Sequence, residues 1–538
     1  MSAGSTIPPV SPAHATALTP ETPLAWPTIV TWMEEQACLT PNQPFFIGRS
    51  PLSYSQAWQR ITDIAAALTH GGLKKGDRLL VVSANRPEIP LLAFAAARVG
   101  IVFTILNDQT RPLAFERVVD QARPSIILLD PNASELAETA RAYCHPPGVP
   151  LVWFSDDPDL IAEDLAFDAW SAPSSESPTL ETPVQPSDLA FLVFTSGSTG
   201  NPRGVMLTHA NVRFVCEAIQ RRLNYQASDR IGVFLPLSFD YGLYQIFYAA
   251  MTGASLYIGT PAQAGPGLAK LLAEQEITIL PGVPTLFGGL AKMLRYRPVE
   301  LPALRQLTNT GDHLPRAIIE DFRQALPNAE VFPMYGLTEC KRVSILLPGE
   351  IDAKPDSVGR PLDGTEVFAV DPDGRRLPPG EVGEWVVRGP HVSPGYWQAP
   401  EETAKRFRVW PETGETVLFS GDQGSVDAEG FLFFHARSDF MIKHKGHRLS
   451  PVELEEAACR LPEVETAGCV KDEARNQLCL FVGVSSGDLT EEAVIEALPR
   501  TLEPVKVPER VILLEALPRT ANQKVDRKAL RQWLSDNA

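Results

Sequence analysis

The sequence predicts an α/β protein built from parallel-rich sheets covered by helices, followed by a β-rich section and a small C-terminal α/β unit. Short, wholly apolar runs alternate with helical patterns along much of the chain, and strands of that composition need burial on both faces. Between about 356 and 434 the pattern changes to short strands separated by turn signals such as Asp371-Pro372-Asp373-Gly374. The 538 residues, 44% of them apolar, can fill several hydrophobic cores.

Individual elements follow from local patterns. Ser53 and Gln56 predict a capping box, and apolar residues then recur at spacings of three and four until Gly71, which predicts an amphipathic helix. The apolar stretch 91–106 is interrupted by Arg98 and is too short to cross a bilayer, so it predicts a core helix followed by a strand. Buried strands are predicted at 79–82, 101–106, 126–129, 189–194, 231–235, 256–258 and 277–280.

The overall charge and the cysteine pattern exclude several classes of function. Lys and Arg number 48 against 65 Asp and Glu, a net charge of −17 without a basic patch, so neither nucleic acid nor a membrane is an expected partner. The seven cysteines are scattered and contain no C-x-x-C pair, which argues against a disulfide framework or a zinc site. No Lys or Arg precedes Arg49, whereas secretory and transit signals need basic residues, so a cytoplasmic location is expected.

The most informative stretch is 191–209, where an apolar strand leads into a loop of hydroxyls and glycines before helical patterning resumes. Glycines let a backbone turn its N–H groups inward and hydroxyls add donors, so such a loop can cradle phosphate. The alternative is a flexible Gly/Ser connector. The spacing fits neither a Walker loop nor a dinucleotide-binding G-x-G-x-x-G. The candidate phosphate ligands are Thr195, Ser196, Gly197, Ser198, Thr199 and Gly200.

This stretch resembles the signature loop of the ANL superfamily of AMP-forming ligases, which includes acyl-CoA synthetases, nonribosomal peptide adenylation domains and luciferases. Further blocks stand in the order found in that family, at 334–339, 419–422, 436–439, 442–446 and 517–530. The composition of residues 1–24 predicts a flexible tail. The resemblance implies a large ATP- and substrate-binding domain at 25–438 and a small, mobile α+β lid domain at 439–538.

The resemblance implies a reaction that uses ATP and Mg²⁺. A carboxylate attacks the α-phosphate, pyrophosphate leaves, and the acyl adenylate is then transferred to a thiol. Because negative charge accumulates on the phosphoryl oxygens during attack, a cation between carboxylate and phosphate lowers the barrier. By resemblance that cation is Lys524, while Thr338 bonds phosphate and Glu339 holds Mg²⁺.

Further nucleotide contacts, and a hinge, are implied in the same way. An aromatic face can stack on adenine, a carboxylate can bond both ribose hydroxyls, and an arginine can support ribose or phosphate. Asp439 matches the hinge about which the small domain swings, presenting first Lys524 and then the 443–446 face. The implied nucleotide residues are Gly311, Asp312, Tyr335, Gly336, Asp422 and Arg437.

The segment 235–244 bears on the substrate class. Asp240 stands where amino-acid adenylation domains carry the Asp that binds the substrate ammonium, and a buried carboxylate needs a cationic partner such as an amine. An amino acid substrate is therefore favoured. Arg342 either binds a second carboxylate or carbonyl of the substrate or is a surface residue. The pocket is predicted to be lined by Tyr241, Tyr244, Thr308, Thr310, Met334, Arg342 and Val343.

Several alternatives remain. Some fatty acyl-AMP ligases also carry Asp in the place of Asp240, so a fatty or aryl acid is the rival substrate. No fused carrier domain is expected after Lys524, so the acceptor is the phosphopantetheine thiol of a separate carrier protein or coenzyme A. Arg203 and Gln523 replace the lysine and glycine usual in the family, which leaves a nucleotide sensor without turnover as the non-enzymatic alternative.

Overall fold

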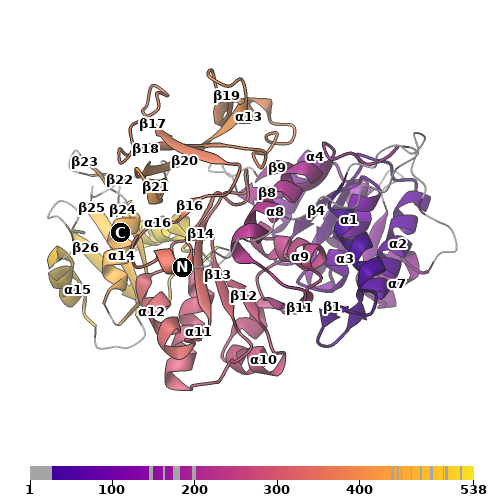
Figure 1. Ribbon diagram of the computed structural model, residues 1–538, viewed down its shortest axis with the longest axis horizontal. Helices are drawn as coiled ribbons and strands as arrows, with labels where there is room; N and C mark the ends of the chain where they lie inside the picture. Colours follow the sequence, from indigo (N-terminus) through magenta and orange to yellow (C-terminus); the bar gives the residue numbers. More distant parts are fainter. Residues whose placement is uncertain are drawn as a thin grey trace, which may run out of the picture.

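Two large sheets with a layer of helices between them form the body of the protein, and a β-rich section and a C-terminal unit lie beside it (Figure 1). This arrangement confirms the predicted α/β fold. The tail 1–24, the loop residues 197–200 and Asp439 lie outside the residues that the computed structural model describes. Those residues are 27–144, 150–161, 164–173, 178, 182–196, 202–437, 442–444, 447–449, 451–461, 463–472, 475, 477–484, 489–500, 502, 507–520 and 524–537.

The first sheet is parallel except at its β8–β9 edge. Leu79 and Leu80, neighbours on one strand, pack into different cores, so both faces of the sheet are buried, as the apolar runs predict. Its strand order is β7 (Leu165–Ala166), β6 (Leu151–Trp153), β5 (Ile126–Leu129), β3 (Arg78–Val82), β4 (Val102–Leu106), β8 (Leu189–Ser196) and β9 (Pro202–Thr208). Its outer face packs against α4 (Pro112–Ala122), η1 (Pro131–Leu136) and α5 (Ala137–Cys144).

The second sheet has a parallel centre and antiparallel edges. Its outer face packs against α10 (Leu268–Glu274), α11 (Pro284–Tyr296) and α12 (Arg316–Ala325). The strand order is β16 (Arg360–Pro361), β15 (Ser344–Ile345), β14 (Glu330–Tyr335), β13 (Gln306–Asn309), β12 (Ile279–Gly282), β10 (Arg230–Val233), β11 (Ser255–Ile258), β1 (Pro44–Ile47) and β2 (Leu52–Ser53).

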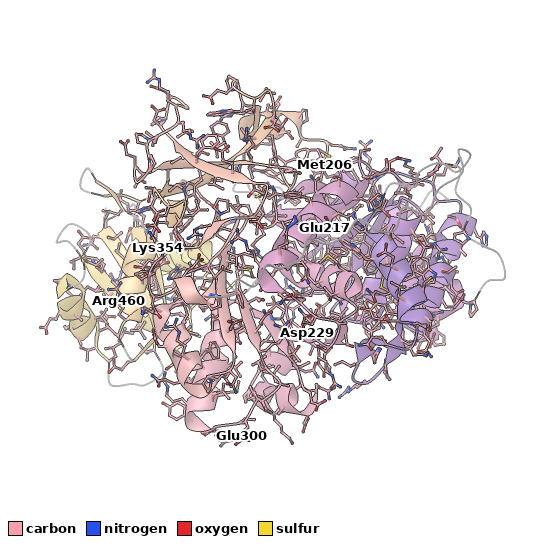
Figure 2. All side chains as sticks on the ribbon, viewed as in Figure 1. Met206, Glu217, Asp229, Glu300, Lys354 and Arg460 are labelled. Carbon is pink, nitrogen blue, oxygen red and sulfur yellow. The ribbon has the colours of Figure 1, made fainter. Side chains whose placement is uncertain are left out.

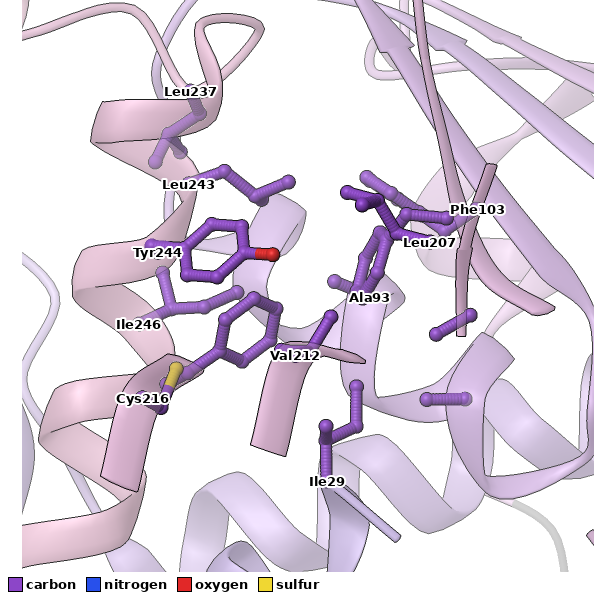
Figure 3. Packing of buried hydrophobic residues seen from close by; sticks show 14 of the residues in the cluster. Ile29, Ala93, Phe103, Leu207, Val212, Cys216, Leu237, Leu243, Tyr244 and Ile246 are labelled. Carbon is purple, nitrogen blue, oxygen red and sulfur yellow. The ribbon is translucent and has the colours of Figure 1, made fainter. Parts of the chain in front are cut away.

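The helices between the two sheets share one core with both of them. Figure 3 shows Tyr244 and Ile246 of α9 and Cys216 of α8 among the side chains of this core, with Phe103 and Leu207 of the first sheet nearby. The predicted capping box at the start of α2 is confirmed, because Ser53 and Gln56 each bond the other's backbone. The helices of this layer are α1 (Val30–Leu39), α2 (Tyr54–His70), α3 (Glu88–Arg98), α8 (His209–Leu223) and α9 (Asp240–Thr252).

The β-rich section and the C-terminal unit follow the body in the chain, as the change of pattern predicts. The first contains β17 (Glu366–Val370), β18 (Gly383–Arg388), α13 (Pro400–Arg406), β19 (Phe407–Val409), β20 (Thr416–Val426) and β21 (Leu432–Arg437). The second contains β22 (Ile442–His444), β23 (His447–Leu449), α14 (Pro451–Cys459), β24 (Val464–Asp472), β25 (Gln477–Val484), α15 (Glu491–Ala497), η4 (Leu498–Arg500), β26 (Arg510–Leu514) and α16 (Arg527–Asp536). Short elements elsewhere are α6 (Pro158–Ile161), α7 (Phe167–Trp170), η2 (Pro261–Ala264) and η3 (Pro348–Glu350). None of the described helices has the length and apolar composition needed to cross a membrane.

A buried ion pair fixes the start of the central strands of the second sheet. Asp229, labelled in Figure 2, precedes β10 and accepts hydrogen bonds from Arg305 Nε at 2.7 Å and Arg305 Nη2 at 2.5 Å. Thr278, next to β12, donates to the same carboxylate at 2.8 Å. One bidentate pair therefore holds the starts of three parallel strands in register, and their opposite ends converge on the candidate site.

The first residue of α8 is a buried histidine. Neither ring nitrogen of His209 has a hydrogen-bond partner among the described residues. Burial lowers the pKa of His209 to about 4, against a raising influence of Asp188 and a smaller lowering one of Lys75. The ring is therefore neutral in the folded protein at pH 5 to 7.

We predict that the free energy of unfolding falls as the pH drops from about 6.5 towards 4, because the unfolded chain then protonates His209 while the folded chain does not. The His209 contribution between pH 7 and pH 5.5 is about 1 kcal/mol. Urea denaturation at the two pH values, compared with His209→Gln, measures it. The same pH dependence in both proteins would contradict the prediction.

Candidate active site

The candidate site lies where β13 and β14 end and α9 begins. Strand β13 ends just after Thr308, β14 ends at Tyr335, and Asp240 is the first residue of α9. Because parallel strands end at the same edge of a sheet, residues from distant parts of the chain meet there. The Tyr241 hydroxyl joins helix to strand by donating to the Thr308 carbonyl at 2.6 Å, and it lies 2.7 Å from Thr308 Oγ1.

Lys341 lies at the centre of this cluster, although the sequence reasoning did not include it. Its side chain is 3% exposed, and its Nζ lies 3.6 Å from Asp240 Oδ2. The ammonium also lies 4.3 Å from the ring centroid of Tyr244 and 5.4 Å from that of Tyr241. Burial lowers the pKa of Lys341 to about 7, and the neighbouring Asp240 carboxylate opposes this shift.

This pairing adds a second possible partner to the sequence argument about Asp240. We expected its cationic partner to be a substrate amine, but the chain supplies an internal cation in Lys341. The Asp240 carboxylate can therefore be buried before any substrate enters the site. The distance of 3.6 Å is longer than that of a tight ion pair, so Asp240 retains capacity to accept further hydrogen bonds.

The backbone around Gly336 explains why Lys341 points inward. A Cβ at Gly336 would lie 2.1 Å from the Lys341 carbonyl oxygen, so only glycine allows the two segments to approach this closely. Lys341 itself adopts φ +60°, a left-handed conformation that is uncommon for a residue with a side chain. Val343 N then donates to the Tyr335 carbonyl at 2.9 Å. The sequence signal that could have revealed Lys341 is the adjacent Lys-Arg pair shortly after Tyr335-Gly336.

Arg342 is buried in the same site and is not a surface residue. Its guanidinium donates through Nη1 to Thr310 Oγ1 and lies 5.1 Å from the Tyr241 ring centroid. Its Nε has no hydrogen-bond partner, and among the described residues no carboxylate pairs with it. Two basic side chains and one carboxylate thus converge, which leaves an excess of positive charge for an anionic group to balance.

Apolar surface adjoins the charged cluster. Met334 and Val343 are buried, as is Tyr244, whose hydroxyl has no partner among the described residues. Asp240 also borders a small pocket on the side of the first sheet. The other residues that line this pocket are Phe103, Ile105, Phe191, Leu192, Val193, Ser238 and Leu243.

The expected ribose contact is held by a hydrogen bond from Tyr335. The Tyr335 hydroxyl donates to Asp422 Oδ2 at 2.5 Å, and its ring packs edge-on against Trp385 at a centroid distance of 5.0 Å. Asp422 is buried, and its backbone N–H donates to Ser420 Oγ at 3.1 Å. Arg437 stands opposite Asp422 in the β20–β21 ladder.

Glu339, the expected Mg²⁺ ligand, is buried and hydrogen-bonded on one side. Its Oε1 accepts from the Tyr396 hydroxyl at 2.6 Å and from Arg406 Nη1 at 3.1 Å. Both described contacts fall on Oε1. The described residues contain no group of three potential metal ligands, and a single carboxylate suits Mg²⁺ that is held mainly by substrate phosphates. Thr338, the preceding residue, is half-buried.

The C-terminal unit places Lys524 beside the end of β13. Gly311 has φ +95°, and a Cβ there would lie 3.8 Å from Lys524 Cε. The Lys524 carbonyl accepts a hydrogen bond from Thr520 N at 2.8 Å, which shapes the turn that carries it. His313 Nε2 lies 3.4 Å from Glu456 Oε1, so the two units also meet next to this position.

Other residues singled out from the sequence are placed less centrally. Asp312 is exposed, and Thr195 is half-buried in β8 opposite Arg203. Arg203 Nη2 forms an ion pair with Glu402 Oε2 at 3.1 Å. Ser196 ends β8, whereas Gly197, Ser198, Thr199, Gly200 and Asp439 lie outside the described residues.

Comparison with known proteins agrees with this geometry. Residues 33–397 match the family model of AMP-binding enzymes, and 453–524 match that of the AMP-binding enzyme C-terminal domain. A long-chain-fatty-acid–CoA ligase of Escherichia coli O6:H1 is 28% identical over 95% of both chains.

Solved structures show the same likeness. The structure of VinN in complex with L-aspartate is 32% identical, with a TM-score of 0.66, over 76% of this chain and 98% of that one. The anthranilate CoA ligase AuaEII in complex with anthranoyl-AMP has the same fold, with 22% identity and a TM-score of 0.87 over 96% of this chain and 99% of that one. The chain therefore belongs to the family of AMP-binding enzymes and is an AMP-forming ligase of the ANL type.

Proposed function

We propose that this ligase adenylates an amino acid with two carboxylates, of the size and charge of aspartate, and passes the acyl group to a thiol. The observation that carries the proposal is the convergence of Asp240, Lys341 and Arg342 in one buried cluster. Adenylation consumes one carboxylate of the substrate. The cluster offers partners for the remaining groups.

The charges of the cluster fit such a substrate. An ammonium group would bond Asp240, which has spare acceptor capacity. The second carboxylate would pair with Arg342, whose planar fork suits a carboxylate and whose only described hydrogen bond goes to Thr310. It would also draw a proton onto Lys341, because a nearby anion favours the charged form of a lysine.

The comparison with VinN supports this assignment. Its structure was solved with L-aspartate, and it is 32% identical to this chain. A fatty acid offers no group to either basic residue. Lys341 would keep Asp240 as its partner, but Arg342 would stay buried with no carboxylate beside it among the described residues. The fatty-acid–CoA ligases among the relatives keep an acyl chain as the second candidate, with the apolar pocket beside Asp240 as its place.

The nucleotide groups are assigned by position. Tyr335 and Gly311 would adjoin adenine, Asp422 with Arg437 would take the ribose, and Thr338 and the 195–200 loop would bond phosphates. Glu339 would hold Mg²⁺, which neutralises charge on the triphosphate. Lys524, beside Gly311, would bridge the attacking carboxylate and the α-phosphate.

The proposed acceptor is the phosphopantetheine thiol of a separate carrier protein. Coenzyme A is the second candidate, because CoA ligases stand among the relatives and both acceptors present the same phosphopantetheine arm. The swing about Asp439 that would bring the 443–446 face to the thiol belongs to this proposal.

Loss of the Lys524 ammonium should abolish adenylation. We expect Lys524→Ala to lower the rate of adenylate formation at least about 100-fold, because the cation assigned to bridge the attacking carboxylate and the α-phosphate is lost. The ATP–pyrophosphate exchange rate measures this step, with Lys528→Ala, an exposed lysine on α16, as the control. Undiminished exchange in Lys524→Ala would refute the assigned role.

The substrate panel tests the charge argument. We expect ATP–pyrophosphate exchange with L-aspartate to exceed exchange with L-asparagine, succinate and octanoate by about 100-fold or more in kcat/KM. Asparagine lacks the second carboxylate, succinate lacks the ammonium and octanoate lacks both. Each rate is measured at equal ATP concentration. Exchange with octanoate alone would support the acyl alternative, and no exchange with any acid would support a sensor.

Variants separate the two polar contacts. Asp240→Asn should raise KM for aspartate about 10- to 100-fold without changing KM for ATP, since Asp240 is assigned to the ammonium and to Lys341 and to no part of the nucleotide. Arg342→Gln should lower kcat/KM for aspartate and so narrow the preference for aspartate over asparagine. Arg316→Gln, a partly exposed arginine on α12, serves as the control. Equal effects of Asp240→Asn on both KM values would argue against the ammonium contact.

A further inference from the structure

The last residue of α13, Arg406, lies between two segments that the proposed function assigns to different ends of the nucleotide. One is the segment 334–339, which ends at Glu339. The other is the segment 419–422, which ends at the ribose residue Asp422. The Arg406 side chain is only 17% exposed, so its guanidinium is committed to partners inside the protein.

Arg406 bonds both segments at once. Its Nη1 donates to Glu339 Oε1 at 3.1 Å. Its Nε donates to the Phe419 carbonyl at 3.0 Å, and its Nη2 donates to the Ser420 carbonyl. The planar guanidinium therefore holds the Glu339 carboxylate and the backbone before Asp422 at a fixed separation, which a flexible point charge could not do.

The segment 419–422 lies within β20, at the point where the register with β18 shifts between Glu384 and Val386. Gly421 has φ +73°, and a Cβ there would lie 3.8 Å from Arg406 Nη2, so the strand passes close to the guanidinium at this irregularity. Two further side-chain contacts are Gly421 N donating to Glu384 Oε1 at 2.9 Å and Ser420 Oγ donating to the Trp385 carbonyl at 2.7 Å. Arg406 adds to these contacts where the ladder with β18 is irregular.

A tyrosine extends the connection to the strand after the signature loop. The Tyr396 hydroxyl donates to the same Glu339 oxygen at 2.6 Å and lies 3.5 Å from Arg406 Nη1. Its neighbours bond β9: Met206 N, on the residue labelled in Figure 2, donates to the Gly395 carbonyl at 3.0 Å, and Trp397 N donates to the Gly204 carbonyl at 2.8 Å. The backbone that follows the signature loop, Glu339 and the ribose segment are thus joined through Tyr396 and Arg406.

We propose that Arg406 is a positioning residue. It holds the ribose segment 419–422 at a fixed distance from Glu339, so that Asp422 reaches the ribose hydroxyls while Glu339 stands at the phosphate end of the same nucleotide. The inference rests on the proposed function for the roles of Asp422 and Glu339. Arg406 does not touch the reacting atoms. Its effect is expected in the discrimination of the ribose.

Equilibrium binding without metal or acid substrate tests this role. Isothermal titration calorimetry gives Kd for AMP and for 2′-deoxy-AMP with the wild-type protein, Arg406→Gln and Arg408→Gln. Arg408, two residues later, is exposed, donates to the Lys405 carbonyl and lies 4.1 Å from the Phe419 ring centroid. Its described hydrogen bonds reach neither Glu339 nor the Phe419 and Ser420 carbonyls, so it is the matched control for the hydrogen bonds of Arg406. We expect the wild type and Arg408→Gln to prefer AMP by about tenfold or more, as one hydrogen bond to a charged group provides.

Arg406→Gln should bring the two Kd values within about twofold of each other, mainly by raising the Kd for AMP. A misplaced Asp422 no longer distinguishes the two nucleotides. Arg406→Lys keeps the charge near Glu339 but cannot bond both carbonyls and the carboxylate, so it should also lose the preference. If Arg406→Gln does not fold, Arg406→Lys is used in its place.

Failure of the proposed function and failure of the positioning role of Arg406 give different results. A wild-type protein that binds neither nucleotide, or binds both equally, would overturn the proposed function together with the inference. A wild-type preference that Arg406→Gln and Arg406→Lys retain would overturn the positioning role alone. Loss of the preference in Arg408→Gln as well would also overturn it, because the effect would then not be specific to the contacts of Arg406.

Discussion

The burial of like charges at the carboxyl edge of the second sheet is the constraint on which the site depends. Lys341 and Arg342 are adjacent in the chain and both are buried, and one carboxylate, that of Asp240, lies 3.6 Å from Lys341. Bringing such groups out of water costs several kcal/mol unless counter-charges are supplied. The fold meets part of this cost with Asp240, the aromatic faces of α9 and the hydroxyl of Thr310.

The same reasoning explains why the nucleotide side is built differently. There the buried carboxylates Glu339 and Asp422 each receive donors from the protein, from Tyr396 and Arg406 in one case and from Tyr335 in the other. Each of these carboxylates therefore has at least one donor within the chain, which holds it in place before a ligand binds. The end around Arg342 keeps positive charge without a carboxylate partner among the described residues, and under the proposed function discrimination between acids would reside there.

Much of the fold could be predicted because its signals are local. The alternation of apolar runs and helical patterns located the central strands, and Ser53 with Gln56 specified a helix start. The motif order also located Asp240, Thr310 and Arg342, which the fold brings together. Lys341 escaped prediction because its inward direction depends on a left-handed backbone and on a glycine five residues earlier. The partners of Glu339 escaped for a related reason, since Tyr396 and Arg406 approach it only through tertiary packing.

The close backbone approach at Gly336 separates what determines the path of the chain from the side chains proposed to select the acid. Since the backbone carbonyl of residue 341 rests against a position that tolerates no side chain, the path of the chain here is set by glycine and not by what 341 and 342 carry. Exchange of Arg342 for a neutral residue could therefore redirect the enzyme towards differently charged acids, while Lys341 stays as the partner of Asp240 and the nucleotide half is left unchanged.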